Sequence, residues 1–181
     1  MSLPVLLRVS AVALLAGALA ACAPDRDEFP PVCPAPVLPA LTGDLAIYRP
    51  GSTGAHLTDL VIQGRMMGIQ GQCKLTSDKH RLDTIVQFSM ELTRGPALPS
   101  HELGVPVYLA VTEGTAILDK RVFLLHGDFP PNVDTITITT GELEMKLPIS
   151  QTKSGAAYAV LAGFQLTPEQ AAAAEAKAAA H

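Results

Sequence analysis

Residues 82–94, Leu82-Asp83-Thr84-Ile85-Val86-Gln87-Phe88-Ser89-Met90-Glu91-Leu92-Thr93-Arg94, decide the fold class, because apolar and polar side chains alternate along most of this stretch. Successive side chains of a β-strand point to opposite faces of the sheet. One face would therefore carry Val86, Phe88, Met90 and Leu92, and the other Gln87, Ser89, Glu91 and Thr93. This pattern predicts an antiparallel strand with one face buried and the other in water.

Shorter patterns on both sides of this stretch predict further strands. Upstream, Leu45 and Ile47 occupy alternate positions, and a longer, irregular strand is expected from about residue 57 to residue 73. Glycines at 64, 68 and 71 predict bulges in that longer strand. Downstream, strands are expected over 105–111, 116–125, 135–140 and 156–166. Residues 141–148 fit either a strand or one turn of helix.

The spacing of these segments, with no helix between them, predicts an all-β fold. We expect an antiparallel two-sheet sandwich over residues 41–166, of immunoglobulin or fibronectin type III appearance. Residues 167–181 are expected to form a short helix, because Thr167, Pro168 and Gln170 make a capping box with proline at the first helical position. The helix has no apolar stripe beyond alanine methyl groups, so we expect it to fray as a tail.

The first 21 residues carry one cation, Arg8, followed by an uncharged apolar run too short to span a bilayer comfortably. The run closes on Leu19-Ala20-Ala21-Cys22, which resembles the lipobox of bacterial lipoproteins. The resemblance implies that residues 1–21 are a signal peptide and that Cys22 becomes an acylated N-terminus. Ala23 resembles the residue of lipoproteins sorted to the outer membrane. The alternative is an ordinary secretory signal cut after Ala20 or Ala21.

Residues 22–40 are expected to form a tether, which Cys33 ends. Six prolines, at 24, 30, 31, 34, 36 and 39, favour an extended, semi-rigid chain. With Cys22 taken by lipid, Cys33 and Cys73 are left as a pair, and in an exported protein they are expected to form a disulfide. Closing a loop of this length would stabilise the domain by roughly 3–4 kcal/mol on the chain-entropy account.

Charge disfavours nucleic acid as a partner. Without the signal peptide, 160 residues remain, with 12 basic and 17 acidic side chains and a formal charge of −5. Nucleic acids and anionic lipid surfaces favour clustered Lys and Arg. The chain has no Trp, three Tyr and five Phe, fewer aromatic residues than binding platforms for sugars or stacked bases usually need.

No set of residues predicts catalysis or metal binding. Ser52 follows Gly51 in a loop without the Gly-x-Ser-x-Gly pattern of a nucleophile elbow. The possible metal ligands have no spacing that converges on one point, so no metal or other cofactor is expected; they are His56, His80, His101, His126, Met66, Met67 and Met90. The charged runs 78–81 and 119–121 are expected to be solvated turns. The glycines over 64–71 lack a phosphate-binding pattern.

Three short motifs resemble a group of uncharacterised proteobacterial envelope lipoproteins. They are Cys33-Pro34, Ile69-Gln70-Gly71-Gln72-Cys73 and Phe164-Gln165-Leu166-Thr167-Pro168-Glu169-Gln170. The resemblance implies an envelope address, and no catalytic residue is carried over from it. With Ala23 after the lipobox cysteine, we expect the chain on the periplasmic face of the outer membrane.

We therefore expect a lipid-anchored, non-enzymatic interaction or assembly module with an envelope protein as partner. An exposed strand edge near Ile62 and Ile69 would bind that partner. The alternative is an envelope lipoprotein that binds a small ligand, or catalyses a reaction, in a pocket between the sheets.

Overall fold

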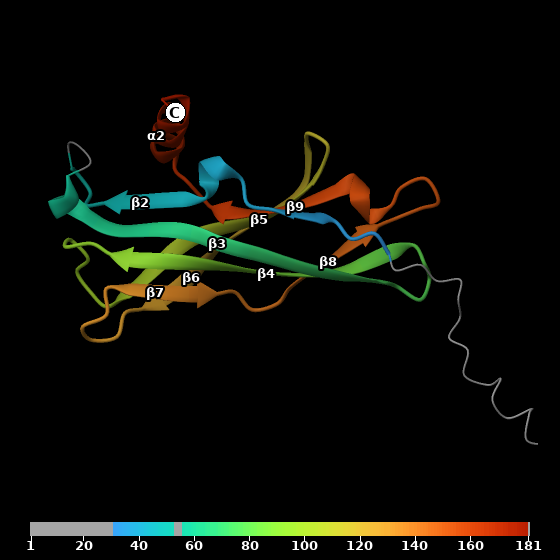
Figure 1. Cartoon of the computed structure of the whole chain (residues 1–181), viewed down its shortest axis with the longest axis horizontal. Helices are drawn as coiled ribbons and strands as arrows, with labels where there is room; N and C mark the ends of the chain where they lie inside the picture. The colour runs from blue at the N-terminus through green and yellow to red at the C-terminus, as the bar shows by residue number, and fades with distance from the viewer. Residues whose placement is uncertain (1–30, 53–55, 181) are drawn as a thin grey trace, which may run out of the picture. The chain divides into compact units, whose positions relative to one another are not determined.

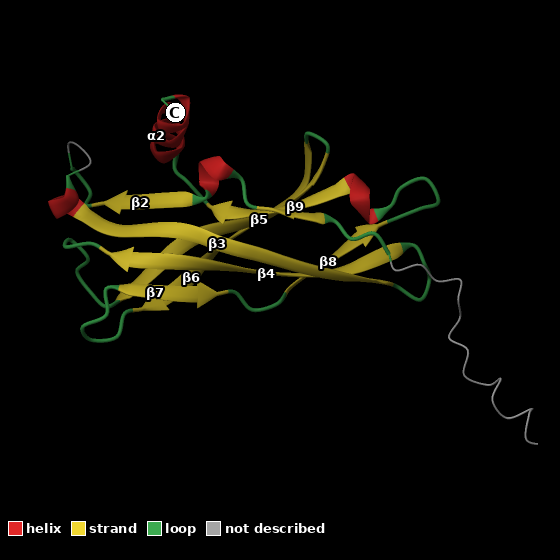
Figure 2. Ribbon diagram, in the orientation of Figure 1, coloured by secondary structure: helices red, strands yellow, loops and turns green. Residues whose placement is uncertain are grey.

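The computed structural model describes residues 31–52 and 56–180, which form two packed β-sheets and a C-terminal helix (Figure 1, Figure 2). The expected signal peptide, Cys22 and the expected tether up to residue 30 lie outside the described residues, as do residues 53–55 and His181.

The five-stranded sheet is built around the alternating stretch. Its strands are β2 (Asp44–Tyr48), β3 (Leu60–Leu75), β4 (Arg81–Arg94), β7 (Thr135–Thr139) and β8 (Leu143–Pro148). The first three are consecutive antiparallel neighbours, and β7 and β8 pair one after the other along the far side of β4. The ambiguous residues 141–148 thus contribute a strand.

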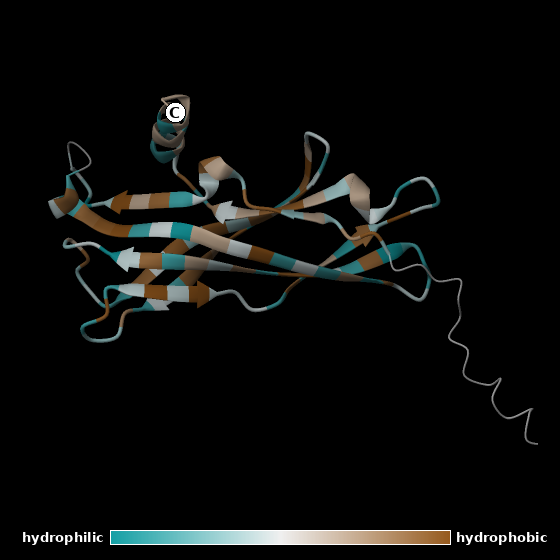
Figure 3. Cartoon of the chain, viewed as in Figure 1, coloured by the Kyte–Doolittle hydropathy of each residue, from teal (hydrophilic) through white to brown (hydrophobic). Residues whose placement is uncertain are grey.

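The predicted buried face of β4 is confirmed. Val86, Phe88, Met90 and Leu92 are each at most 1% exposed, and the polar side chains between them are half-buried. Figure 3 shows the alternation as brown and teal bands along β3 and β4. Full burial of a side chain of this size is worth about 1.5–3 kcal/mol relative to exposure, so this row stabilises the sandwich strongly.

The four-stranded sheet covers the other side of the core. Its order is β1 (Ala35–Val37), β9 (Tyr158–Phe164), β5 (Glu102–Glu113) and β6 (Ala116–Asp128). β5 pairs antiparallel with both neighbours, whereas β1 pairs parallel with β9. The predicted core-facing residues of β5 and β9 are buried; they are Val105, Val107, Leu109, Val111, Tyr158, Val160, Ala162 and Phe164. Tyr108 and Ala110, at intervening positions of β5, are buried as well, so burial in this strand does not alternate.

A bulge in β3 confirms one of the sequence predictions. Met66 lies opposite Met90, and Gly68 lies opposite Ser89, so Met67 is an extra residue. Because side chains alternate with a period of two, the insertion moves the core-facing positions from even to odd residue numbers. Gly64 has a different role, since a Cβ there would lie 2.8 Å from Cζ of Phe164.

The segment before β2 changes sheets. β1 pairs with β9, the short 3-10 helix η1 (Ala40–Thr42) follows, and β2 then pairs with β3. The expected disulfide is present, with the Cα atoms of Cys33 and Cys73 5.6 Å apart. β1 lies inside the range 22–40 that was expected to be tether, so the ordered domain begins soon after Cys33, before the expected boundary at residue 41.

The C-terminal helix α2 (Pro168–Ala179) has the predicted capping box of Thr167 and Gln170. It does not simply extend as a tail, since Nε2 of Gln170 donates a 3.1 Å hydrogen bond to the carbonyl oxygen of Ala46 in β2. The Nζ atom of Lys177 also lies 3.9 Å from Oδ2 of Asp44 in β2. The helix therefore attaches to the sandwich through polar contacts rather than through an apolar stripe.

The two-sheet sandwich with a short C-terminal helix agrees with the predicted fold class. The strand order differs from that of a constant-type immunoglobulin domain. Here β2, β3 and β4 are sequential neighbours in one sheet. The constant-type immunoglobulin order places strands A, B, E and D together instead. Two 3-10 turns, η2 (Leu57–Asp59) and η3 (Gly155–Ala157), precede β3 and β9.

Candidate functional site

The edge strands of the two sheets differ in length and in whether another part of the chain packs against them. β2, β7 and β8 are five or six residues long, and β1 is three, whereas β6 has thirteen. Within the described part of the chain, β6 pairs only with β5. Long, unpaired edge strands attract other strands, and most proteins keep edges short or covered. β6 is therefore the candidate interaction strand.

The edge of β2 is covered by the C-terminal helix. Leu45 and Ile47 pair with β3, and the carbonyl of Ala46 between them turns outward and accepts the hydrogen bond from Gln170. This contact satisfies one outward backbone group and places α2 beside the strand.

The edge expected near Ile62 is wrong. Ile62 is fully buried and pairs with Ile47 on one side and Arg94 on the other, so it is not at an edge. Ile69 pairs with Phe88 on one side and lies beyond the end of β2, so an edge at Ile69 stays a prediction. The Cys33–Cys73 bond lies near the end of this part of β3.

Alternate residues of β6 turn their backbone N–H and C=O groups away from β5, toward solvent. In antiparallel pairs, a residue turns both its N–H and its C=O to the same neighbour. Gln165 donates to the carbonyl of Pro106, so even-numbered residues of β5 face β9 and odd-numbered residues face β6. The partners of those odd residues include Phe123 and Arg121. It follows that Lys120, Val122 and Leu124 turn their backbone groups away from β5. We call these groups the open edge of β6.

Large apolar side chains are exposed along the same strand. Their exposed fractions are 64% for Ile117, 51% for Leu118, 54% for Val122 and 52% for Leu124. Scattered exposed apolar residues are ordinary, but four on one unpaired edge strand form a surface that a partner could cover. The sequence carries a signal for this, since apolar residues occur on both faces of 116–125 and the clean alternation of β4 is absent.

Three charged residues lie in the middle of β6. Residues 119–121 were expected to form a solvated turn, and this is wrong, because they pair with β5 within the strand. Asp119 and Arg121 share a face, with Oδ2 and Nε 3.6 Å apart, and Arg121 also donates to the carbonyl of Glu144. Lys120 points to the other face, where its Nζ lies 4.7 Å from the centre of the Tyr108 ring.

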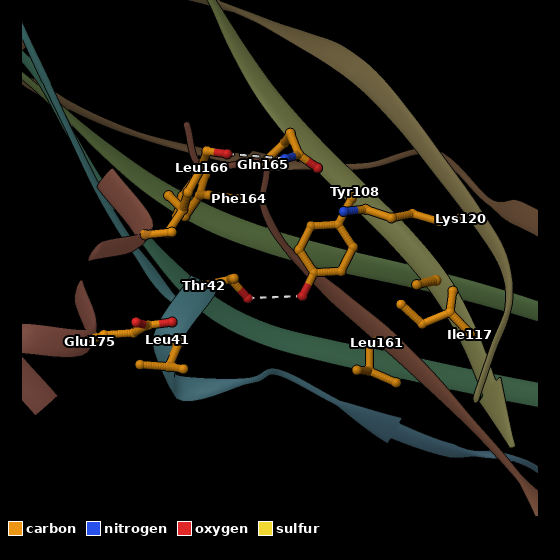
Figure 4. A pocket seen from close by; sticks show the side chains of 12 residues that line it. Leu41, Thr42, Tyr108, Ile117, Lys120, Leu161, Phe164, Gln165, Leu166 and Glu175 are labelled. Carbon is orange, nitrogen blue, oxygen red and sulfur yellow. Dashed lines mark hydrogen bonds between the residues drawn. The ribbon is translucent and has the colours of Figure 1, made fainter. Parts of the chain in front are cut away.

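A shallow hollow of about 310 Å³ lies on the outer face of the four-stranded sheet, between β6, η1 and α2 (Figure 4). Its lining is mainly apolar, with Leu41 and Leu161 among its walls. The hydroxyl groups of Thr42 and Tyr108 are 2.9 Å apart at its floor. The side-chain oxygen of Gln165, which also lines the hollow, is buried without a hydrogen-bond partner.

Between the two sheets, buried apolar side chains of the described residues form one packed core. A second hollow of about 390 Å³ opens at the side of the sandwich, between β6 and β8. Leu118, Met145 and Tyr158 contribute apolar lining, and charged side chains of both strands form its rim. Beside it, Lys153 lies 2.7 Å from Glu113 and 4.6 Å above the Tyr158 ring, and the hydrogen bond to Glu113 raises the pKa of Lys153.

The residues considered for chemistry do not come together. His56 precedes η2, His80 is in the turn between β3 and β4, His101 precedes β5, and His126 is in β6. Met66 and Met90 are buried core residues, whereas Met67 is the exposed bulge residue. Ser52 donates to Asp59. Across residues 31–52 and 56–180, no group of three or more His, Cys, Asp or Glu could hold a metal ion.

The turn at 76–81 contains the most perturbed carboxyl group described. Asp78 accepts hydrogen bonds from the Thr76 hydroxyl and the His80 amide and pairs with Arg81. These contacts, with the Thr76 hydrogen bond the largest cause, lower the pKa of Asp78 to about 2. The group stabilises a solvated hairpin turn, as the sequence predicts for residues 78–81.

None of the helices in the described ranges is long and apolar enough to cross a bilayer. No protein-family model, curated protein or solved structure matches the chain.

Proposed function

We propose that this protein is a lipid-anchored envelope module, without enzymatic activity, that binds a partner protein through the open edge of β6. The observation that carries this proposal is a thirteen-residue edge strand whose outward backbone groups lie beside exposed apolar side chains. A partner strand would satisfy those backbone groups, and its side chains would cover the apolar ones.

The address of the protein is supported by two independent features. Leu19-Ala20-Ala21-Cys22 has the residues of a lipobox, and the Cys33–Cys73 disulfide fits an oxidising compartment such as the periplasm. Acyl chains on Cys22 would hold the protein on a membrane, since each buried methylene contributes about 0.8 kcal/mol. We place the anchored protein on the periplasmic face of the outer membrane.

The proposal is tested with two proline substitutions, each at a residue whose N–H turns away from its own sheet. Val122→Pro removes an outward donor from β6 and leaves the β5–β6 hydrogen bonds in place. Thr137→Pro is the matched control, because Thr137 is exposed on β7 and pairs with Glu91 while Ile136 and Ile138 face the core.

Both variants would first be checked for folding by circular dichroism. A photo-crosslinking residue at Leu124 would then report the partner in intact envelopes. We expect adducts in the parent and in Thr137→Pro, and a strong loss of adducts in Val122→Pro. Equal adducts in both proline variants would contradict binding along β6.

The hollow beneath α2 supports a second candidate, the binding of a small apolar ligand with one hydrogen-bond donor. The supporting observation is the unpartnered Gln165 oxygen in an apolar wall. Buried polar atoms rarely lack a partner. Gln165→Leu would remove this acceptor, and the loss of a ligand that co-purifies with the parent protein would favour this candidate over the edge.

A further inference from the structure

We propose that the partner of β6 is a second copy of the same chain, paired antiparallel with Lys120 opposite Lys120 of the partner subunit. This inference rests on the proposed function of β6 as a binding edge. The result would be a symmetric dimer in which two four-stranded sheets join into one continuous sheet.

The charges at the centre of β6 complement themselves in this register. Asp119 comes to lie opposite Arg121 of the partner subunit, and the same pair recurs on the other side of the two-fold axis. Asp119 and Arg121 share one face of the strand, as their 3.6 Å contact indicates. They turn their backbone groups to β5, so across the new interface they form non-hydrogen-bonded pairs, in which opposing side chains come closest.

Neighbouring registers are disfavoured by the same charges. A shift of two residues in one direction places Arg121 opposite Arg121 of the partner subunit. A shift in the other direction places Asp119 opposite Asp119 of the partner subunit. A shift of one residue would turn the core face of one copy to the outer face of the other. Like charges directly opposite each other destabilise a strand pair, so the sequence Asp119-Lys120-Arg121 selects one register.

Lys120 is the residue on the two-fold axis, and two ammonium groups at this point would repel each other. The structure holds its Nζ 4.7 Å from the centre of the Tyr108 ring, over the neighbouring strand β5 (Figure 4). The ring face attracts the cation and draws the charge inward from the edge. The repulsion across the axis is therefore reduced.

Exposed apolar side chains lie on both sides of this charged centre. Val122 and Leu124 follow it, and Leu118 precedes it; all three are more than half exposed. The β5–β6 register shifts between Val111 and Thr112, so Leu118 is an extra residue and the regular alternation of β6 holds from Asp119 onward. Pairing would bury apolar surface at the same time as it satisfies the backbone groups of the open edge.

The first test uses single cysteines in the full chain, purified with its lipid in detergent. In the proposed register the Cα atoms of residue 120 in the two copies form a hydrogen-bonded pair about 5.5 Å apart, within reach of a disulfide. Residue 124 is the matched control, because it has the same outward direction while its two copies would lie roughly 27 Å apart along the strands. We expect a covalent dimer from Lys120→Cys under mild oxidation and monomer from Leu124→Cys.

The second test exchanges the charges and does not depend on cysteine chemistry. Asp119→Arg places cations at both positions 119 and 121, and Arg121→Asp places anions at both. Each variant should dimerise roughly tenfold more weakly than the parent, since two attractive pairs become repulsive. Mixing the two variants, or combining both substitutions in one chain, should restore the dimer. Arg65→Asp, at an exposed ion pair of the other sheet, is the control and should leave it unchanged.

Sedimentation of the purified chain and its variants provides the readout for the second test. Cross-linking from position 124 and not from position 120, or no recovery on mixing, would overturn the self-pairing. A chain that is monomeric in both tests but still gives larger envelope adducts from β6 would overturn self-pairing and support the proposed function. The absence of both dimer and adducts would contradict both.

Discussion

Nε2 of Gln170 donates a 3.1 Å hydrogen bond to the carbonyl oxygen of Ala46, which joins the first turn of α2 to the edge of β2. The side-chain oxygen of the same amide accepts from the Thr167 amide in the capping box. One side chain thus caps the helix and covers a strand edge. This treatment of β2 contrasts with β6, whose outward groups have no strand beside them in the described structure.

Gln170→Glu is expected to separate these two roles. The carboxylate can still accept the capping hydrogen bond at this position, but it cannot donate to Ala46. We expect faster amide hydrogen exchange in β2 and a loss of about 0.5–1.5 kcal/mol in the free energy of unfolding. Unchanged exchange in residues 44–48 would show that the contact does not hold the helix on the strand.

Gly64→Ala is expected to destabilise the core. The added Cβ would lie 2.8 Å from Phe164 and 3.1 Å from Leu92, so at least one buried side chain would have to move. Overpacking of this kind costs about 1–3 kcal/mol. Gly71→Ala is the matched control on the same strand, because its nearest neighbour would be 3.7 Å away. Urea denaturation that shows equal stability for the two variants would contradict the packing described for β3.

Thr76→Val is expected to raise the pKa of Asp78 from about 2 towards its ordinary value of 3.8. The folded pKa lies below the unfolded one, so the stabilisation is present above about pH 3.8 and is lost as the pH falls through about 2. NMR titration of the Asp78 carboxyl carbon measures this directly. A midpoint that stays near 2 in Thr76→Val would assign the shift to His80 and Arg81 instead.

The burial of one face of β4 could be predicted, because apolar and polar residues alternate along this strand. The structure buries the four apolar residues of this pattern, Val86, Phe88, Met90 and Leu92, at the centre of the sheet. The disulfide was predictable because the lipobox resemblance assigns Cys22 to lipid and leaves Cys33 and Cys73 as one pair. Periodicity and composition are local properties, and these features depend mainly on them.

Features that depend on distant residues were not predictable. β1 is three residues long and lies among prolines, so it has no recognisable strand pattern. It forms because it pairs with β9, more than a hundred positions away. The attachment of α2 depends on Ala46, which no helical pattern reports. The open edge of β6 follows from strand order, which no local pattern reports. The sequence predicted an edge near Ile62, but this residue is paired on both sides. The lack of clean alternation over 116–125 was the one local sign of the open edge of β6.

If Leu19-Ala20-Ala21-Cys22 is a lipobox, Cys22→Ser is expected to leave the unprocessed precursor and to remove acyl label from the protein, because serine lacks the thiol that would carry the lipid. Growth with labelled palmitate followed by gel analysis measures both effects. Cys73→Ser is the control, since it breaks the disulfide and should keep the label. Palmitate still attached to Cys22→Ser would contradict the lipobox interpretation and favour an ordinary secretory signal.

Amide hydrogen exchange at single residues of β6 tests the central claim most directly, since it observes the outward N–H groups themselves. The account predicts that the amides of Lys120, Val122 and Leu124 exchange slowly in the bound protein and become fast on dilution to the single chain. The amide of Thr137, outward on β7, should be fast in both states. Amides of β6 that exchange equally fast in the bound and single states would contradict binding along this edge.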